Sequence, residues 1–452
     1  MFRQKIAWIG SLGLRIRSYS VQRKHFNIQS NFFDNLQIEH NVISELKELN
    51  TIRKSKGCIQ TLQRLFNEYS NESDGTKKNL LKLNVIKEIK KFPNKTHPDV
   101  EKYGANADPV ELYSYGDLHQ NPIPDGKSCE ELCKLSNTFR MSKLGNFTGP
   151  RSYYFMNSVA KLEQALIRYT TDILFKEGFE LIAVPDILPA ELIEACGMAV
   201  DGDHQVYRVQ PSNLCLSGTS EMALAGYLSG QTFPAKEMPK KLMAVSRCFR
   251  AEADTKSEDG NLYRVHYFTK VEMFAACHPN KSNDLLEEFR SIQCRLFEGL
   301  GLCFKLYDMP IHDLGAPAYR KYDIEAWIPS RKSFGEISST SNCTDYQSKR
   351  LNIYCQEDDT KILAHTVNGT ACAIPRMIIA ILEQYQTSRS VLVPEALQPY
   401  MGEKELRTSN AVPRICLTKI KGENESNEEN EPKKWKKGKK KKKLQNEDER
   451  EQ

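Results

Sequence analysis

The sequence predicts an α+β protein in which helices flank an antiparallel β-sheet, and three observations lead to that prediction. Residues 264–273 alternate between polar and apolar side chains, the period of two that a β-strand produces. A polar loop joins them to a preceding strand-like stretch at 246–250, as in an antiparallel hairpin. Apolar residues at 159, 162, 166, 169 and 173 follow the spacing of one helix face.

Composition indicates a large globular protein with appended segments. The chain has 452 residues, of which 40% are hydrophobic and 27% charged. A formal net charge of +6 permits a polyanionic partner without establishing one. Thirteen cysteines, an odd number without paired metal-ligand spacing, favour buried thiols in a reducing compartment. No apolar run approaches the length of a bilayer span, so we expect no membrane insertion.

The N-terminal segment 1–33 contains no Asp or Glu, but it carries Arg3, Lys5, Arg15, Arg17, Arg23 and Lys24. A basic, acid-free segment with interspersed apolar residues is typical of a cleavable mitochondrial presequence. Residues 17–20, Arg-Ser-Tyr-Ser, resemble a matrix-processing site, so we expect the protein in the mitochondrial matrix. A basic disordered N-terminus is the alternative. A secretory signal is disfavoured because the apolar stretch 6–14 is short and broken by glycines.

Residues 34–92 predict a short helical hairpin. Apolar residues recur at spacings of three and four along 38–49, 59–66 and 81–89, a turn lies at 71–75, and Pro93 ends the last helix. The two hairpin helices, 58–70 and 76–91, would be about 20 to 24 Å long at 1.5 Å per residue. The second of them is basic, with Lys77, Lys78, Lys82, Lys87, Lys90 and Lys91.

Residues 93–148, rich in Pro, Asn, Asp and Gly, predict a linker with short elements, and the main domain follows at 149–402. This domain opens with the helix 159–173 and a strand at 180–184 that Pro185 ends. Further on, Thr219 precedes a helix-like run at 222–228, where its hydroxyl would cap the helix.

The hairpin at 247–277 carries the candidate site. On its second strand one face presents Arg264, His266, Phe268, Lys270 and Glu272, and the other face is apolar. On the first strand Ser246, Cys248 and Arg250 share a face, with Glu252 beyond them. Pairing the two strands would bring two arginines beside a phenyl ring and two carboxylates. That set suits an anionic ligand with a flat ring and an amine, although the solvated face of an ordinary sheet gives the same alternation of charge.

Four segments resemble the signatures of one enzyme family. The hairpin resembles motif two of class II aminoacyl-tRNA synthetases in its seryl form, F-R-x-E, a loop, then R-x-H-x-F-x-K-V-E. Residues 318–345, AYRKYDIEAWIP followed by FGEISSTSNCTD, and residues 365–376, HTVNGTACAIPR, are similar to the seryl signature and to motif three. Helix 159–173 with its strand resembles motif one. The residues around Pro375 resemble those of animal mitochondrial enzymes of this family. The whole resemblance spans 93–402.

The resemblance implies a class II synthetase catalytic domain that activates serine with ATP and Mg²⁺ and charges mitochondrial tRNA(Ser). It also implies a dimer, with an identical or a related subunit. The implied ATP ligands are Arg250, Glu252, Arg264, Phe268, Glu336 and Arg376, of which the three arginines are the catalytic residues. The implied serine ligands are Thr219, Arg250, Glu272, Asn368 and Thr370. Glu336 and Ser339 are the implied Mg²⁺ ligands.

Two details of these motifs can be checked. Glu336 and Ser339 are three residues apart, so they would face opposite sides of a regular strand, and a shared ligand requires a β-bulge or a strand end there. The loop 253–261 departs from the bacterial pattern of glycines and an arginine, with Lys256, Asp259 and Gly260 instead. This departure concerns recognition of the tRNA acceptor end.

Both ends of the chain leave alternatives open. The family's N-terminal arm grips tRNA, whereas this short hairpin could equally pack on its own domain. Residues 403–452 carry a lysine run at 433–443 and predict a disordered tail, solvated or attracted to RNA, with nuclear import as a further reading. Two rival functions also stand. One is an inactive paralogue that binds tRNA or a partner subunit, and the other is an amino-acid:carrier-protein ligase, whose relatives hold zinc in the pocket.

Overall fold

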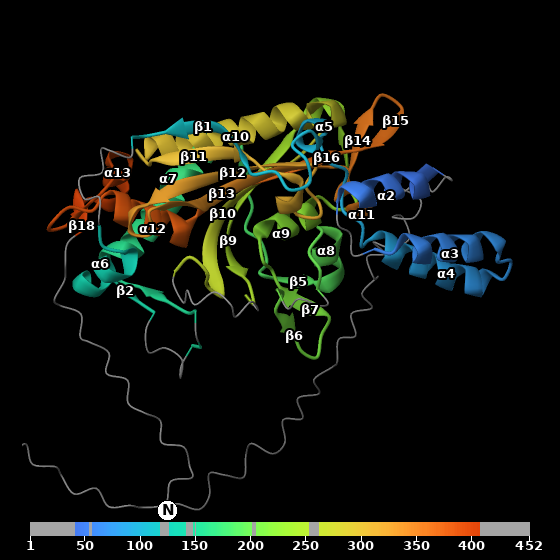
Figure 1. Cartoon of the computed structure of the whole chain (residues 1–452), viewed down its shortest axis with the longest axis horizontal. Helices are drawn as coiled ribbons and strands as arrows, with labels where there is room; N and C mark the ends of the chain where they lie inside the picture. The colour runs from blue at the N-terminus through green and yellow to red at the C-terminus, as the bar shows by residue number, and fades with distance from the viewer. Residues whose placement is uncertain are drawn as a thin grey trace, which may run out of the picture. The chain divides into compact units, whose positions relative to one another are not determined.

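A computed structural model describes residues 41–53, 57–117, 126–141, 148–149, 151–200, 205–252 and 262–406 (Figure 1). Among these residues, no helix combines the length and the apolar character needed to cross a bilayer. The predicted presequence, the loop 253–261 and the lysine run lie outside the described residues.

An eight-stranded sheet forms the centre of the fold. Its strand order is β1-β11-β12-β13-β16-β10-β9-β4, and every neighbouring pair is antiparallel except β4 with β9. The strands are β1 (Val110–Tyr115), β11 (Phe304–Asp308), β12 (Arg320–Ile328), β13 (Ser333–Thr344), β16 (His365–Ala373), β10 (Tyr267–Cys277), β9 (Lys240–Phe249) and β4 (Glu180–Leu181). The predicted antiparallel sheet is thus confirmed.

Helices cover both faces of this sheet (Figure 1). On β10, Met273 and Ala275 join one apolar cluster, and Phe274 and Ala276 join the other, because successive side chains point to opposite faces. The first cluster includes helices α7 (Asn157–Lys176), α10 (Ser282–Gly299) and α12 (Ile374–Gln384). The second includes α8 (Ala190–Ala195) and α9 (Ser220–Leu228). The central strands are therefore buried on both sides.

The segment assigned to a linker contributes to this core. It forms α5 (Pro98–Glu101), β1, α6 (Cys129–Ser136) and β2 (Phe139–Arg140), which pairs with β3 (Tyr154–Phe155). Strand β1 is an edge of the main sheet, and the Cys129 amide donates to the Glu383 carboxylate of α12 at 2.9 Å. Short elements were predicted here, but turn-forming composition did not indicate that they pack into the core, because partners far along the chain stabilise them.

Smaller elements surround the main sheet. One small sheet joins β5 (Ile187–Pro189), β6 (Arg208–Val209) and β7 (Leu214–Leu216), and a second joins β8 (Thr232–Pro234), β14 (Tyr354–Glu357) and β15 (Thr360–Leu363). Strands β17 (Val391–Leu392) and β18 (Glu405–Leu406) form a pair. The short helices are α11 (Ser348–Leu351) and α13 (Gln398–Met401), with 3₁₀ turns at η2 (Ala235–Glu237), η3 (Pro279–Lys281), η4 (Ile311–Asp313), η5 (Pro329–Arg331) and η6 (Glu395–Leu397).

The N-terminal arm is the predicted helical hairpin with one preceding helix. It consists of α2 (Asn41–Ile52), α3 (Ile59–Asn71) and α4 (Gly75–Ile89). The side chain of Asp74 caps α4 by accepting from the Lys77 amide at 2.8 Å. Its own small core consists of Leu62, Val85, Ile86, Ile89 and Phe92.

Arg53, directly after α2, fixes the arm to the sheet domain. Its side chain is 4% exposed and donates to four backbone carbonyls, those of Asn94, Leu314, Gly315 and Ala318, at 2.8 to 3.0 Å. Burial lowers the pKa of its guanidinium to about 10, which still leaves it charged at neutral pH. The arm is therefore joined to the loop before β12 by a buried charge.

Replacing Arg53 with Met should lower the free energy of unfolding by about 3 kcal/mol, because several buried carbonyls would lose their donor. Urea titration of the purified protein measures this change. Arg64→Met is the matched control, since the Arg64 side chain is 65% exposed and pairs with Glu68 on the same helix. That control should cost less than about 0.5 kcal/mol. Equal effects of the two substitutions would contradict the anchoring role.

Candidate active site

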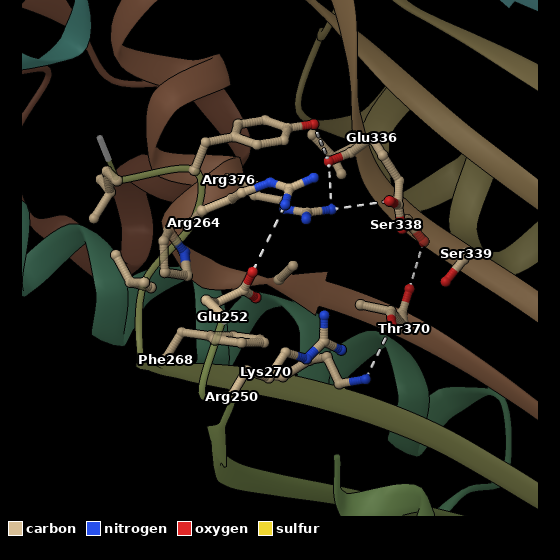
Figure 2. Close-up of a pocket in the computed structure, with 16 residues that line it drawn as sticks. Arg250, Glu252, Arg264, Phe268, Lys270, Glu336, Ser338, Ser339, Thr370 and Arg376 are labelled. Atoms are coloured by element: carbon tan, nitrogen blue, oxygen red, sulfur yellow. Dashed lines mark hydrogen bonds and ion pairs between the residues drawn. The ribbon is translucent and has the colours of Figure 1, made fainter. Parts of the chain in front are cut away.

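One pocket brings together three arginines that are distant in the sequence (Figure 2). Arg250 follows β9, Arg264 precedes β10, and Arg376 lies in the first turn of α12. The same pocket is lined by Glu252, Phe268, Lys270, Glu336, Ser339 and Thr370, among others. Nine side chains of this group come from the hairpin, β13, β16 and the start of α12, so the central strands assemble the site.

Pairing between β9 and β10 places the hairpin residues. Phe268 lies opposite Cys248 and Lys270 opposite Ser246. The Arg250 amide donates to the His266 carbonyl at 2.9 Å, which keeps the two chains together beyond the strand ends. Strand β10 begins at Tyr267, so the predicted strand was too long at its start. Arg264 and His266 lie in the approach to it, where the His266 ring bonds to the Tyr207 hydroxyl at 2.9 Å.

Each arginine of the pocket has its own counter-group. The Arg250 guanidinium lies 5.3 Å from the centroid of the Phe268 ring, and its Nε is buried without a hydrogen-bond partner among the described residues. Arg264 lies 3.8 Å from the Glu252 carboxylate. Glu252 has a φ of 45°, and its carbonyl accepts from Arg151 at 2.7 Å, which fixes the backbone that carries this carboxylate.

Arg376 is held against Glu336 at the start of α12. Its NH1 lies 3.1 Å from the Glu336 carboxylate and 3.0 Å from the Glu336 carbonyl oxygen. Desolvation opposes ionisation of Glu336, but the charges of Arg376 and Lys321 outweigh it, so the pKa of this carboxyl lies below its usual value. Pro375 occupies the first turn of α12, where the helix dipole favours an anion such as phosphate.

The predicted irregularity between Glu336 and Ser339 is present. On β12, Ile324 pairs with Ser338 and Glu325 pairs with Glu336, so Ile337 is an extra residue in β13. This β-bulge allows Glu336 and Ser339 to line the same pocket. A carboxylate and a hydroxyl oxygen are hard ligands of the kind that Mg²⁺ prefers, so this pair fits a magnesium ion.

A second group of polar side chains adjoins the arginines. The Thr219 hydroxyl donates to the Glu272 carboxylate at 3.0 Å, and Glu272 is 2% exposed. Lys270 forms an ion pair with Glu272 and donates to the Thr370 hydroxyl at 3.3 Å. Lys270, which had no predicted role, thus links the predicted serine ligands Glu272 and Thr370. Its place on the polar face of the hairpin was the available signal.

Asn368 lies farther along β16, opposite Phe274, and is linked to a residue that sequence reasoning missed. Its amide donates to the Glu221 carboxylate at 2.7 Å, and Gln347 donates to the same oxygen at 2.5 Å. Burial, together with the nearby charge of Glu272, raises the pKa of Glu221 to about 7. Glu221 follows the cap Thr219 by two residues, so this network connects the start of α9 with β16.

Replacing Glu221 with Gln should reduce the loss of stability that occurs as the pH rises. A carboxyl whose pKa rises from 4.5 to about 7 on folding binds its proton more tightly in the folded state. Its stabilising contribution is therefore complete below about pH 4.5 and is lost by about pH 7. Between pH 5 and 8 the wild type should lose about 2 kcal/mol more than the variant.

Denaturant titration at both pH values measures the difference. Asp323, whose pKa burial also raises to about 7, is present in both proteins, so its contribution cancels. Parallel pH profiles for the two proteins would show that Glu221 is already ionised in the folded state.

Three comparisons with known proteins can be set beside this geometry. Residues 206–385 match the family described as tRNA synthetase class II core domain (G, H, P, S and T). The mitochondrial serine--tRNA ligase of Bos taurus is 44% identical over 332 residues, which cover 72% of this chain and 64% of the bovine protein. The mitochondrial serine--tRNA ligase of Saccharomyces cerevisiae is 38% identical over 370 residues, which cover 78% of this chain and 80% of the yeast protein.

A solved structure agrees with the sequence relatives. The seryl-tRNA synthetase of Pyrococcus horikoshii, complexed with ATP, aligns with a TM-score of 0.69 at 27% identity. The alignment covers 84% of this chain and 97% of the archaeal one. The match to the bovine and mouse proteins covers less than two thirds of their length, 64% in each case.

Proposed function

This chain belongs to the seryl-tRNA synthetase family, and on that premise we propose that it activates serine with ATP and transfers the seryl group to mitochondrial tRNA(Ser). The observation that carries the proposal is the convergence of Arg250, Arg264 and Arg376 on one pocket beside an acidic, hydroxyl-rich corner. The arginines can bind the negatively charged oxygens of a triphosphate. The corner, formed by Thr219, Lys270, Glu272 and Thr370, offers hydrogen-bond partners to an amino acid.

The arginines bind and orient ATP. Arg250 holds the α-phosphate together with the serine carboxylate, because a planar guanidinium binds oxyanions with two donors. Arg264 and Arg376 neutralise the outer phosphates. Phe268, beside Arg250, supplies a face for adenine, and Glu252 accepts from the adenine edge. Glu336 and Ser339 would hold Mg²⁺, which would supply charge neutralisation to the phosphates.

Activation then depends on orientation. A carboxylate oxygen of serine attacks the α-phosphorus, the bond to the bridging oxygen breaks, and pyrophosphate leaves with that oxygen. The terminal ribose hydroxyl of tRNA next attacks the seryl carbonyl carbon, and AMP leaves. In the first step no proton has to be removed from the attacking oxygen, so the residues act by positioning and by charge stabilisation.

The corner around Glu272 selects serine. Glu272 and Thr219 accept from the ammonium group, while Thr370 and Asn368 face the side chain. Lys270 occupies this corner by pairing with Glu272 and Thr370. Alanine would leave buried polar groups of the corner unpaired, which is a stronger basis for discrimination than shape alone.

A dimer is part of the proposal, formed by two copies or with a related subunit. The motif-one region leaves large apolar side chains exposed, namely Phe175 at 52%, Leu181 at 45% and Ile187 at 48%. Leu181 lies on β4, an edge strand of the main sheet. Apolar side chains at an unpaired sheet edge are stabilised by a partner surface. The relatives named mitochondrial, together with the acid-free N-terminus, support a location in the mitochondrial matrix.

Serine-dependent exchange of pyrophosphate with ATP tests the activation step. The wild-type protein should exchange with serine and not with alanine. Arg250→Ala should lower kcat/KM by about 100-fold, because it removes charge stabilisation at the α-phosphate. Arg389→Ala, at an exposed position outside the pocket, is the control and should match the wild type. A folded wild-type protein that gives no exchange would instead support the inactive paralogue.

The arm is tested separately through its basic residues. Lys77 and Lys87 are exposed on α4, so the double substitution Lys77→Gln, Lys87→Gln should raise the KM for tRNA(Ser) about three- to tenfold and leave exchange unchanged. Charging assays at two salt concentrations provide the measurement. Glu68→Gln on α3 is the control, because it removes a negative charge from the arm and should not raise the KM for tRNA(Ser). An unchanged KM for tRNA would favour the alternative in which the hairpin only packs on its own domain.

A further inference from the structure

Tyr263, the residue before Arg264, contacts the phosphate end of the pocket in a way that the motifs do not describe. Its hydroxyl donates to the Glu336 carbonyl at 2.7 Å. The Arg376 guanidinium lies 4.5 Å from the centroid of its ring, and that of Arg331 lies 4.9 Å from it. Burial raises the pKa of this hydroxyl to about 12, so it remains a donor at neutral pH.

One backbone oxygen therefore receives two donors. The Glu336 carbonyl accepts from the Tyr263 hydroxyl and also from Arg376, at 3.0 Å (Figure 2). Two donors on one oxygen, together with the ring beside the guanidinium, fix Arg376 relative to β13. Leu262 and Val265, both buried, fix the backbone on either side of the tyrosine. Tyr263 thus connects the hairpin, β13 and α12 at one point.

The glycine before Glu336 makes this approach possible. A Cβ atom built on Gly335 would lie 2.8 Å from the Tyr263 hydroxyl oxygen, closer than real contacts allow. Alanine at this position would displace the hydroxyl from the Glu336 carbonyl. Substitutions at Gly335 and at Tyr263 can therefore each disrupt the hydrogen bond between the Tyr263 hydroxyl and the Glu336 carbonyl.

We propose that Tyr263 is a positioning residue for ATP binding, which holds Arg376 and the Glu336 carbonyl in the arrangement that receives the outer phosphates. This inference rests on the proposed function for the identity of the nucleotide. It concerns the phosphate end of the pocket, where Tyr263 contacts Glu336 and Arg376, and not the serine corner around Glu272. A change at Tyr263 should consequently act on ATP and leave serine unaffected.

Kinetics of pyrophosphate exchange test the inference. Tyr263→Leu, which removes ring and hydroxyl, should raise the KM for ATP about tenfold. Tyr263→Phe restores the ring and should limit the rise to about threefold, and Gly335→Ala should match Tyr263→Phe. The KM for serine should stay within about twofold of the wild type in all three. Tyr169→Phe is the control, because it removes a hydroxyl bond to a buried carbonyl, that of Leu296, outside the pocket.

Calorimetric titration of the same proteins with Mg²⁺ and ATP, in the absence of serine, separates this inference from the proposed function. A wild-type protein that binds ATP more tightly than Tyr263→Leu but shows no exchange would support the inference and overturn the function. An ATP affinity of Tyr263→Leu within about twofold of the wild type, or equal shifts for ATP and serine, would overturn the inference. Absence of ATP binding by folded wild-type protein would overturn both.

Discussion

The pocket depends on a counter-group for each of its three guanidinium groups. Like charges at short range repel, and each arginine is offset by a group of its own. Arg264 faces Glu252 at 3.8 Å, Arg376 faces Glu336 at 3.1 Å, and Arg250 lies over the Phe268 ring. The antiparallel register of β9, β10, β13 and β16 places these counter-groups. The sheet therefore reduces the electrostatic repulsion among the three arginines. The polyphosphate proposed to bind there would meet arginines that are already oriented.

The local sequence pattern predicted the structure correctly where the functional side chains follow the two-residue period of a β-strand or depart from it visibly. The alternation along β10 predicted that Phe268, Lys270 and Glu272 share a face, and the spacing of Glu336 and Ser339 predicted a β-bulge, which lies at Ile337. The antiparallel class II core and the seryl family, both predicted from the motifs, are confirmed by the comparisons. The residue roles within the pocket stay predictions.

Contacts between distant segments could not be predicted in the same way. Glu221 was not among the predicted site residues, yet it accepts hydrogen bonds from Gln347 and Asn368, which are more than a hundred positions away. Strand β1 was hidden because its stability comes from β11 and not from its own composition. The early start assigned to β10 was wrong since the alternation of side chains continues through Arg264 and His266, where the backbone no longer pairs as a strand.

The arm and the polar group around Asn368 meet at one turn, residues 343–344. Asn94, whose carbonyl accepts from Arg53, donates through its side chain to the Cys343 carbonyl at 2.8 Å and to the Thr344 hydroxyl at 2.9 Å. The Cys343 sulfur lies 3.6 Å from the amide nitrogen of Asn368. The root of the arm is thus linked through Cys343 to Asn368, one of the predicted serine ligands. This arrangement gives the arm a structural function in addition to any contact with tRNA.

The most direct measurement is a crystal structure of the protein with Mg²⁺ and a non-hydrolysable ATP analogue. The account predicts one nucleotide, with its α-phosphate on Arg250, its outer phosphates between Arg264 and Arg376, and its adenine on Phe268. A nucleotide bound elsewhere, or bound here with any of these arginines turned away from the phosphates, would contradict it.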